Sequence, residues 1–316
     1  MKFPYYPGCT LKDRTSQLEI AALASAKKLG IQLEEMPNWT CCGAVYPVSE
    51  TRIMNLVAPI RILKEVAEAG DDKLVTICDF CYNVLKRANL AIQQDDVKRA
   101  RVNLFLSDDD RRWAASGRQV GEGEAYDGNV KVLHYLEVLR DELGFEAIAE
   151  AVVKPLKDLK IAPYYGCNLL RPAGEMNFDD PENPQIMENL LKRLGAQTVD
   201  FGYRIECCGS FLALSSPPAA RRLSHNILES ARKNGAEALM LSCPMCFYNI
   251  ESKQREFAKH YPGFQPLPVL FFTQVLALAL GLDPDSLGFE KHFLDPRSLL
   301  RERGLVKPPS LAGSEA

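Results

Sequence analysis

The ten cysteines of this 316-residue chain form two sets of five with the same internal order. Each set has a leading cysteine, then a Cys-Cys-Gly sequence, and then a Cys-x-x-Cys sequence. The members are Cys9, Cys41, Cys42, Cys78 and Cys81 in the first half, and Cys167, Cys207, Cys208, Cys243 and Cys246 in the second half. Because thiolates are ligands of zinc and of iron–sulfur clusters, the pattern predicts one metal-binding site in each half.

The intervals within the two sets are also similar. The cysteine pair follows the leading cysteine after 31 residues in the first half and after 39 in the second. The Cys-x-x-Cys sequence follows the pair after 35 and 34 residues. Self-similarity at this long period indicates duplication of a whole domain rather than a solenoid of short units. We therefore predict two similar lobes, at residues 1–150 and 151–316.

Each half has one thiol more than the common metal sites need. A structural zinc site and a cubane iron–sulfur cluster each take four thiolates, so a fifth indicates a cluster of unusual shape or a bridging ligand. Neighbouring side chains in an extended chain point to opposite faces. Cys41 and Cys42 can therefore meet one cluster only if the backbone turns sharply, which Gly43 and, in the second half, Gly209 permit.

The segments around the cysteines alternate between strand and helix. We predict a strand that ends near Cys9, further strands at 31–33, 73–77, 160–165 and 238–242, and helices at 11–29, 82–93 and 185–194. Another helix is predicted after Ser49, its N-cap, with an apolar face from Ile53 to Leu63 and a kink at Pro59. Ser216-Pro217-Pro218 is typical of a helix start. This alternation predicts an α/β fold of two Rossmann-like lobes, each with a parallel sheet.

Four of the cysteines follow predicted strands: Cys9, Cys78, Cys167 and Cys243. Ligands of open α/β sheets bind at the carboxyl ends of the strands. The N-termini of the helices that follow should favour thiolate and cluster charge there. The thiols of each lobe are thus predicted to converge on one edge of its sheet.

The two halves close with similar apolar segments, at 130–139 and 267–276. Before this closing segment the first half carries 28 additional residues, around 95–129, which are rich in Asp, Arg and Gly. Such a composition is typical of a solvated helix and loop, so we predict a surface insertion.

The composition is that of an ordinary soluble protein, with 47% hydrophobic and 25% charged residues and a net charge of -3. Basic residues are dispersed among acidic ones, so no nucleic-acid partner is indicated. The longest apolar stretch, 267–282, is shorter than the roughly 20 residues that span a bilayer. The first residues lack a signal-peptide core, and we expect a reducing, cytoplasmic setting.

Taken together, these motifs resemble a known family. The chain contains twice a leading Cys, a Cys-Cys-Gly and a Cys-x-x-Cys, and Tyr-x-Gly precedes the leading Cys both times, at 6–8 and 164–166. This pattern resembles the cysteine-rich CCG domain. A chain of two such domains resembles the B subunit of heterodisulfide reductase, over about residues 2–294. The resemblance implies that each set of five cysteines holds a noncubane [4Fe-4S] cluster. It further implies an oxidoreductase that acts on a sulfur group and reduces a disulfide to two thiols.

The resemblance also implies partners and a substrate. The chain has no Gly-x-Gly-x-x-Gly fingerprint and no compact ferredoxin-type cysteine run. A ferredoxin-like iron–sulfur subunit of the C type would therefore relay electrons from a flavin subunit of the A type. The substrate disulfide is expected between the lobes, with one electron passing to each sulfur. In methanogenesis it would be the mixed disulfide of coenzyme M and coenzyme B, whereas bacterial relatives act on a small sulfur-carrier protein or serve electron bifurcation with another acceptor.

Three alternatives stay open. Related CCG proteins transfer electrons in other dehydrogenases, in fumarate-reducing enzymes, or in sulfur-oxidising and bifurcating complexes. A zinc-binding structural protein with four thiolates in each lobe would leave one cysteine of each set unused. A thioredoxin-type dithiol at Cys78 and Cys81, or at Cys243 and Cys246, would leave six cysteines without a role.

Some residues near the cysteines are weaker candidates. Five arginines lie within about a dozen residues of a cysteine and could pair with an anionic substrate: Arg14, Arg52, Arg171, Arg221 and Arg222. His134, in an apolar strand, is expected to be a core histidine. His225 is a weak candidate for a proton donor. Trp39 is expected to shield a cluster or to fill the core.

Overall fold

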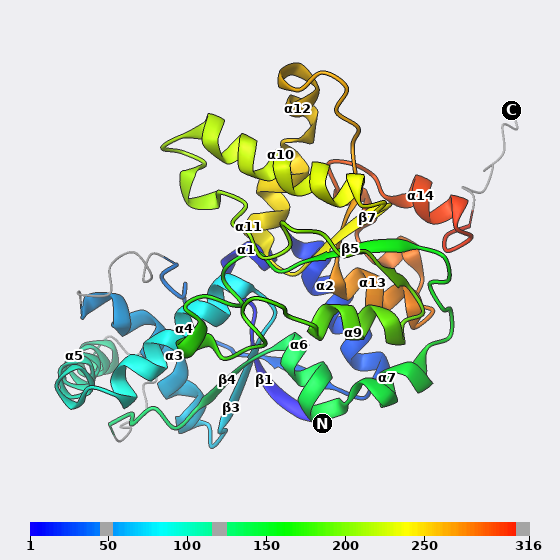
Figure 1. Ribbon diagram of the computed structural model, residues 1–316. Helices are drawn as coiled ribbons and strands as arrows, with labels where there is room; N and C mark the ends of the chain where they lie inside the picture. Colours follow the sequence, from blue (N-terminus) through cyan, green and yellow to red (C-terminus); the bar gives the residue numbers. More distant parts are fainter. Residues whose placement is uncertain (45–52, 116–124, 308–316) are drawn as a thin grey trace, which may run out of the picture.

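The computed structural model describes residues 1–44, 53–115 and 125–307, and is drawn as a ribbon in Figure 1. Ser49 and Arg52, two of the residues singled out in the sequence, lie outside the described residues. The described chain contains two four-stranded parallel sheets, one in each half. In Figure 1 the first sheet lies at the lower centre and the second above it.

The two sheets have the same strand order. It is β2-β1-β3-β4 in the first half and β6-β5-β7-β8 in the second, with every neighbouring pair parallel. The strands are β1 (Lys2–Tyr6), β2 (Gln32–Glu35), β3 (Lys73–Thr76), β4 (Lys131–His134), β5 (Lys160–Tyr164), β6 (Gln197–Thr198), β7 (Ala238–Leu241) and β8 (Val269–Phe271). The predicted fold of two duplicated α/β lobes is confirmed, while the boundary at residue 150 stays a prediction.

Helices flank both sheets. In the first half they are α1 (Cys9–Lys12), α2 (Ser16–Lys28), α3 (Met54–Glu68), α4 (Asp79–Gln93), α5 (Asp96–Ala115), α6 (Tyr135–Glu137) and α7 (Phe145–Ala151). In the second half they are α8 (Ala173–Met176), α9 (Ile186–Arg193), α10 (Pro217–Lys233), α11 (Pro244–Phe247), α12 (Gln254–His260), α13 (Phe272–Ala279) and α14 (Arg297–Glu302). Short π-helical segments extend α6 (Val138–Leu143) and α11 (Tyr248–Ser252), and 3-10 turns occur at Ser210–Leu212, Pro284–Ser286 and Phe289–Lys291. None of the helices within the described ranges combines the length and apolar character that crossing a membrane requires.

The strand order places a switch point beside the cysteines. The chain passes from β1 to β2 on one side of β1 and then crosses to β3 on its other side, so the order reverses at β1. Ligands of doubly wound sheets bind outside the carboxyl ends of the strands at such a point. Cys9 and Cys78 follow β1 and β3, and Cys167 and Cys243 follow β5 and β7 in the same way.

Two predicted helices have different limits in the structure. The helix expected at 11–29 is two helices, because Thr15 turns back and bonds the carbonyl of Thr10 through both its N–H and its hydroxyl. The helix expected from residue 82 begins at Asp79 instead, with Cys78 as its N-cap. The Cys-x-x-Cys sequence thus forms the first turn of α4, which brings residues three apart onto one face. The predicted start after Ser216 is confirmed, and α3 continues through Pro59.

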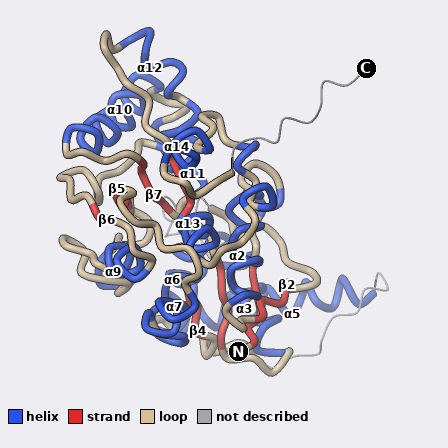
Figure 2. The backbone as a smooth tube through the Cα atoms, turned by 90° about the vertical axis from the view of Figure 1, so that its right-hand side faces the viewer, coloured by secondary structure: helices blue, strands red, loops and turns tan. Residues whose placement is uncertain are grey.

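The halves meet around a local two-fold relationship. Tyr135 and Phe272 occupy equivalent places at the start of the two closing helices, and their rings contact each other with centroids 6.1 Å apart. Equivalent residues touch in this way across a two-fold axis. Nearby, α2 of the first half lies beside α13 of the second, and the hydroxyl of Thr273 donates to the carbonyl of Leu18 (3.0 Å; Figures 1 and 2).

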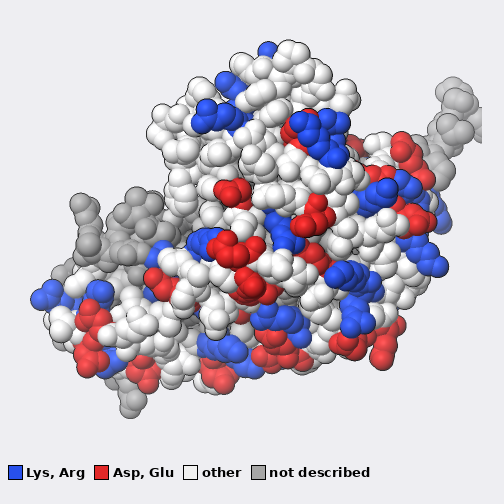
Figure 3. Space-filling model, viewed as in Figure 1, with Lys and Arg blue, Asp and Glu red and all other residues white. Residues whose placement is uncertain are grey.

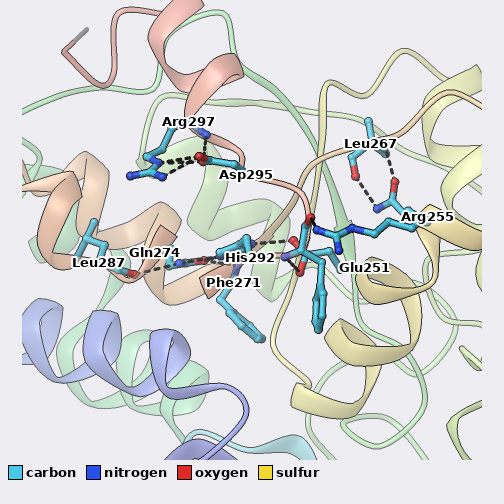
Figure 4. Close-up of polar contacts among 11 residues, drawn as sticks. Glu251, Arg255, Leu267, Phe271, Gln274, Leu287, His292, Asp295 and Arg297 are labelled. Atoms are coloured by element: carbon cyan, nitrogen blue, oxygen red, sulfur yellow. Dashed lines mark hydrogen bonds and ion pairs between the residues drawn. The ribbon is translucent and has the colours of Figure 1, made fainter. Parts of the chain in front are cut away.

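A buried polar network ties the C-terminal segment to the second lobe. Nδ1 of His292 lies 2.8 Å from Glu251, and its Nε2 lies about as close to the amide of Gln274, as Figure 4 shows. Gln274 in turn accepts the N–H of Phe271 and donates to the carbonyl of Leu287. The network fixes the segment that packs over β8 and α13.

The insertion in the first half is partly buried. Its helix, α5, packs against α3 and α4, with Val102 and Leu106 in the core. Tyr126, near its end, donates a 2.9 Å hydrogen bond to buried Asn89. On the face shown in Figure 3, basic and acidic side chains lie side by side, as their even dispersal in the sequence predicts.

Candidate functional site

The structure brings the five cysteines of the first half together in one chain of thiol contacts. Cys9 contacts Cys41, Cys41 contacts Cys42, Cys42 contacts Cys81, and Cys81 contacts Cys78. The Sγ atoms of Cys42 and Cys81 are 3.5 Å apart. All five thiols are free of disulfide bonds. We call this group the first pentad.

The second half repeats this order of contacts. Cys167 contacts Cys207, Cys207 contacts Cys208, and Cys208 and Cys243 both contact Cys246. The Sγ atoms of Cys167 and Cys207 are 4.0 Å apart, and no cysteine of this second pentad is in a disulfide. In neither pentad, nor elsewhere among the described residues, do three side chains converge as the ligands of a single metal ion do.

Each pentad has a buried end and an accessible end. Cys42, Cys78 and Cys81 are buried, whereas Cys9 and Cys41 are exposed. In the second pentad Cys208, Cys243 and Cys246 are buried, and Cys167 and Cys207 are half-buried. The leading cysteine and the first of the adjacent pair are therefore the most exposed cysteines of both pentads.

The tyrosine of the Tyr-x-Gly-Cys sequence positions the adjacent cysteines. Tyr6 donates a 2.7 Å hydrogen bond to the carbonyl of Thr40, the residue before Cys41. In the second lobe, Tyr164 donates a 2.7 Å hydrogen bond to the carbonyl of Glu206, the residue before Cys207. Burial, reinforced by the negative charge of nearby thiolates, raises the pKa of both phenols, so they stay protonated and donate.

The glycine of the same sequence makes room for the last cysteine of the pentad. Gly8 has a φ of +74°, and a Cβ on it would lie 2.7 Å from Sγ of Cys81. Gly166 has a φ of +64°, and a Cβ there would lie 3.2 Å from Sγ of Cys246. Each Tyr-x-Gly-Cys sequence thus touches all three parts of its pentad. The occurrence of this Tyr-x-Gly-Cys sequence in both halves is the signal in the sequence for these contacts.

The first cysteine of each adjacent pair has a thiol with a lowered pKa. The hydrogen bond from Cys42, with N–H groups of Gly43 and Ala44, lowers the pKa of Cys41 to about 5. Bonds from Cys167 and Cys208, with the N–H of Gly209 at 3.3 Å, lower the pKa of Cys207 to about 2. The partner thiols show the opposite shift, and the pKa of Cys208 rises to about 12. Each lobe thus holds one preformed thiolate where the predicted sharp turn occurs.

A cavity of about 370 Å³ lies where the two lobes meet. Thr10 and Arg14 line it from the first lobe, and Met245 and Tyr248 line it from the second. Thr10 follows Cys9, and Met245 lies between Cys243 and Cys246. The cavity therefore adjoins cysteine-bearing segments of both pentads.

The weaker candidates have mostly structural contacts. Arg171 pairs with Glu182, and Arg221 lies 4.0 Å from Glu256. Arg222 is exposed, and Arg14 is highly exposed beside Asp13 at the rim of the cavity. The ring of His225 stacks on Tyr261 with centroids 3.7 Å apart, which places it within an aromatic cluster of the second lobe. Trp39 packs edge-on against Tyr6 and donates to Glu35.

His134 is buried, as expected, and it has a specific polar environment. Its Nε2 lies 2.9 Å from the carbonyl oxygen of Ile77 and 3.2 Å from Oδ1 of Asp79. Asp79 is a completely buried carboxyl group that sequence reasoning did not select. Its partners come from distant parts of the chain, so the sequence around it gives no sign of them.

Comparison with known proteins agrees with this duplicated geometry. The sequence profile of the cysteine-rich domain, CCG, matches residues 3–86 and 161–251. The chain belongs to the CCG family. Both matched ranges contain a complete pentad, so the CCG domain recurs in both lobes as predicted.

Relatives within the CCG family include subunits of two kinds of reductase. The chain is 31% identical to a subunit from Wolinella succinogenes named "8-methylmenaquinol:fumarate reductase membrane anchor subunit", over 94% of this chain and 99% of that protein. It is 29% identical to the B subunit of a ferredoxin/F420H2-dependent CoB-CoM heterodisulfide reductase from Methanosarcina acetivorans, over 92% and 93%. The B subunit of a ferredoxin:CoB-CoM heterodisulfide reductase from Methanosarcina mazei is 28% identical over 92% and 93%. The predicted resemblance to the B subunit of heterodisulfide reductase is confirmed.

Among solved structures, this CCG protein has the fold of a hypothetical protein from Helicobacter pylori. The TM-score is 0.66 at 14% sequence identity, and the match covers 92% of this chain. It spans about half, 51%, of the H. pylori chain. At this identity the likeness concerns the fold alone.

Proposed function

We propose that this CCG protein is the catalytic subunit of a reductase complex of the heterodisulfide reductase type. The proposal rests on one observation: five cysteines form the same chain of thiol contacts in both lobes, with the more exposed cysteines at one end of each chain. Ten free cysteines divided into two complete pentads are more than a zinc-binding structural protein or a single redox dithiol would use.

The residues of each pentad fit a noncubane [4Fe-4S] cluster. The sulfurs are reduced, adjacent to one another and partly preformed as thiolates, which is the state in which cysteine binds iron. Gly8 and Gly166 leave no side chain between the leading and last cysteines. When bound, a cluster supplies single electrons and an iron site for sulfur. The ten cysteines would be the ligands, five for each cluster.

The substrate we propose is a disulfide that is reduced to two thiols. This change consumes two electrons and two protons, so two pentads that each pass one electron match the requirement. The interlobe cavity would hold the organic part of the substrate against the aromatic ring of Tyr248 and the thioether of Met245, while Arg14 at the rim would pair with an acidic group. The mixed disulfide of coenzyme M and coenzyme B, and other thiol or protein disulfides, are candidates.

Partners are part of the proposal. Electrons would come from a ferredoxin-like iron–sulfur subunit and, through it, from a flavin subunit. The segment after the second Cys-Cys-Gly exposes three apolar side chains close to that pentad, Phe211 (49%), Leu212 (39%) and Leu214 (97%). We propose that the iron–sulfur subunit covers them, because the name of each heterodisulfide reductase relative describes it as one subunit of a larger enzyme. A cytoplasmic location suits ten reduced thiols.

A second candidate function is supported by the Wolinella relative. Its name assigns it to an enzyme that couples a menaquinol to fumarate, so the present chain could serve as an electron-transfer subunit of such an enzyme. The two candidates differ in whether sulfur compounds react at this subunit. They share the prediction of iron–sulfur clusters.

Anaerobic purification followed by iron, sulfide and zinc analysis is the first test. We expect about eight iron atoms per chain, four for each cluster, and an EPR signal of the partly oxidised protein that changes when a thiol is added. About eight irons with a signal indifferent to thiols would favour the fumarate-type role, checked by assaying quinol-dependent fumarate reduction with the partner subunits. A colourless protein with zinc alone would overturn both candidates.

A variant of one pentad separates the roles of the two lobes. Replacing Cys207 with serine should leave about four irons, those of the first pentad, and abolish disulfide reduction. Full activity in this variant would contradict a reaction that needs both pentads.

A further inference from the structure

A buried hydrogen bond joins the two pentads across the lobe boundary. Asp79 directly follows Cys78, and its side chain is completely buried. Its Oδ2 accepts a 3.0 Å hydrogen bond from the hydroxyl of Ser242, which directly precedes Cys243. The bond therefore connects the backbone at one cysteine of the first pentad with the backbone at one cysteine of the second.

His134 contacts the same carboxyl group from within the first lobe. Its Nδ1 accepts the N–H of Leu136, so the proton of the neutral ring is on Nε2. This Nε2–H donates to the carbonyl of Ile77 (2.9 Å), and Oδ1 of Asp79 lies 3.2 Å from the same nitrogen without a hydrogen bond of its own. Ile77 and Asp79 are the neighbours of Cys78, so His134 contacts the chain on both sides of that cysteine.

The fold itself does not require this polar group. In the second lobe the place of Asp79 is taken by Pro244, and the place of His134 is taken by Phe271, whose ring stacks on Phe247. That lobe forms the same sheet with an apolar contact at this point. Burying a carboxyl group costs free energy unless it is well paired. The buried carboxyl group is present in the first lobe and absent from the equivalent place in the second. This difference indicates that it has a role in joining the lobes.

The bond lies beside one buried cysteine of each pentad. Cys78 is the chain neighbour of Asp79, and Cys243 is the chain neighbour of Ser242, so the 3.0 Å bond links the segments that carry these two cysteines. A change in that bond therefore acts first on the spacing between Cys78 and Cys243.

We propose that Asp79, Ser242 and His134 are positioning residues that fix the spacing between the two pentads and thereby the electronic and magnetic coupling between their clusters. The proposal rests on the proposed function only in requiring a cluster at each pentad. It predicts a defined intercluster distance that depends on one hydroxyl group.

The test is the variant Ser242→Ala, which removes the interlobe bond and leaves the contact of Asp79 with His134. The reconstituted protein is analysed for iron and then by pulsed EPR with both clusters paramagnetic. We expect the iron content of the wild type with a weaker or broader intercluster interaction. Ser242→Thr, which keeps the hydroxyl, should restore the wild-type interaction.

Two matched controls separate positioning from general loss of stability. Thr273→Val removes another buried interlobe hydroxyl bond, to the carbonyl of Leu18, between two helices that contain no cysteine, α13 and α2. Ser224→Ala removes a buried hydroxyl bond to the carbonyl of Cys208 within one lobe. Both should keep the wild-type intercluster interaction.

The outcomes are distinct. An unchanged interaction in Ser242→Ala, or an equal change in Thr273→Val, would overturn the proposal while leaving the clusters in place. If Ser242→Ala failed to fold, Asp79→Leu would decide, because it removes the acceptor of the bond from Ser242, and a wild-type interaction there would also overturn the proposal. A wild-type protein without iron would contradict the proposed function instead.

Discussion

Gly8 and Cys81 are packed so closely that no side chain fits between them. A Cβ on Gly8 would lie 2.7 Å from the sulfur of Cys81, and the backbone of Gly8 has a φ that L residues rarely adopt. We expect Gly8→Ala to displace Cys81 and to reduce the iron content by about half, because only the first pentad is affected. Iron analysis of the purified variant measures this directly.

Gly30→Ala is the control for this change. Gly30 has nearly the same φ, +72°, but nothing lies within 4 Å of a Cβ placed on it. It should lose stability by about 1 kcal/mol through backbone strain and keep its full iron content. Equal iron loss in both variants would show that strain, rather than contact with Cys81, is responsible.

Removing the Tyr6 hydroxyl should loosen the adjacent cysteines of the first pentad. Tyr6→Phe deletes the hydrogen bond to the carbonyl of Thr40 and leaves that carbonyl partly buried without its partner, at a cost of about 1–3 kcal/mol. We expect faster loss of iron to a chelator, with Tyr164→Phe acting likewise on the second pentad. Tyr135→Phe, whose hydroxyl makes only a 3.5 Å contact with Ser25, should release iron at the wild-type rate.

The sequence was sufficient for features that depend on local pattern. The pentads, the parallel sheets and the strand-end position of Cys9, Cys78, Cys167 and Cys243 follow from spacing and from runs of apolar residues. The break in the helix at 11–29 did not, because it depends on Thr15 bonding the carbonyl of Thr10. Helix periodicity continues through that point and gives no sign of it.

Contacts between distant residues were beyond sequence reasoning. Tyr6 and Thr40 are 34 positions apart, and Asp79 and Ser242 are 163 apart, so each pair is joined only by the tertiary fold. The first pair is indicated in the sequence, because the tyrosine recurs at the equivalent position of the second half. The second pair has no counterpart in the sequence repeat, so no pattern in the sequence indicates it.

The acidity of Cys41 should appear in its reactivity. Its pKa of about 5 lies below the ordinary value near 8.5, so the thiolate persists as the pH falls until about 5. Burial raises the pKa of Cys9, which is similarly exposed. In iron-free, reduced protein at pH 6 to 7, iodoacetamide should modify Cys41 before Cys9, as peptide mass mapping would show. Faster labelling of Cys9 would contradict this order of pKa values.

The apolar side chains after the second Cys-Cys-Gly should matter for assembly. Leu214→Asp places a charge on a residue that is 97% exposed, so the fold should tolerate it while a docked iron–sulfur subunit should not. We expect loss of co-purification with that subunit at unchanged iron content. Val97→Asp, at a 60% exposed position of α5, is the control and should assemble normally. Normal assembly of Leu214→Asp would place the docking surface elsewhere.

The cavity between the lobes should determine which disulfides bind. Arg14 is highly exposed at its rim, so Arg14→Ala should raise KM about tenfold or less for a disulfide with an acidic group, in line with the loss of one charge-assisted hydrogen bond. The kcat should change little, because Arg14 contacts none of the thiols in the described structure. A neutral disulfide of similar size should show no change in KM. Arg222→Ala removes an exposed arginine outside the cavity lining, so it should leave the KM of both disulfides unchanged. An equal rise in KM for neutral and acidic substrates would show that Arg14 does not recognise the negative charge of the substrate.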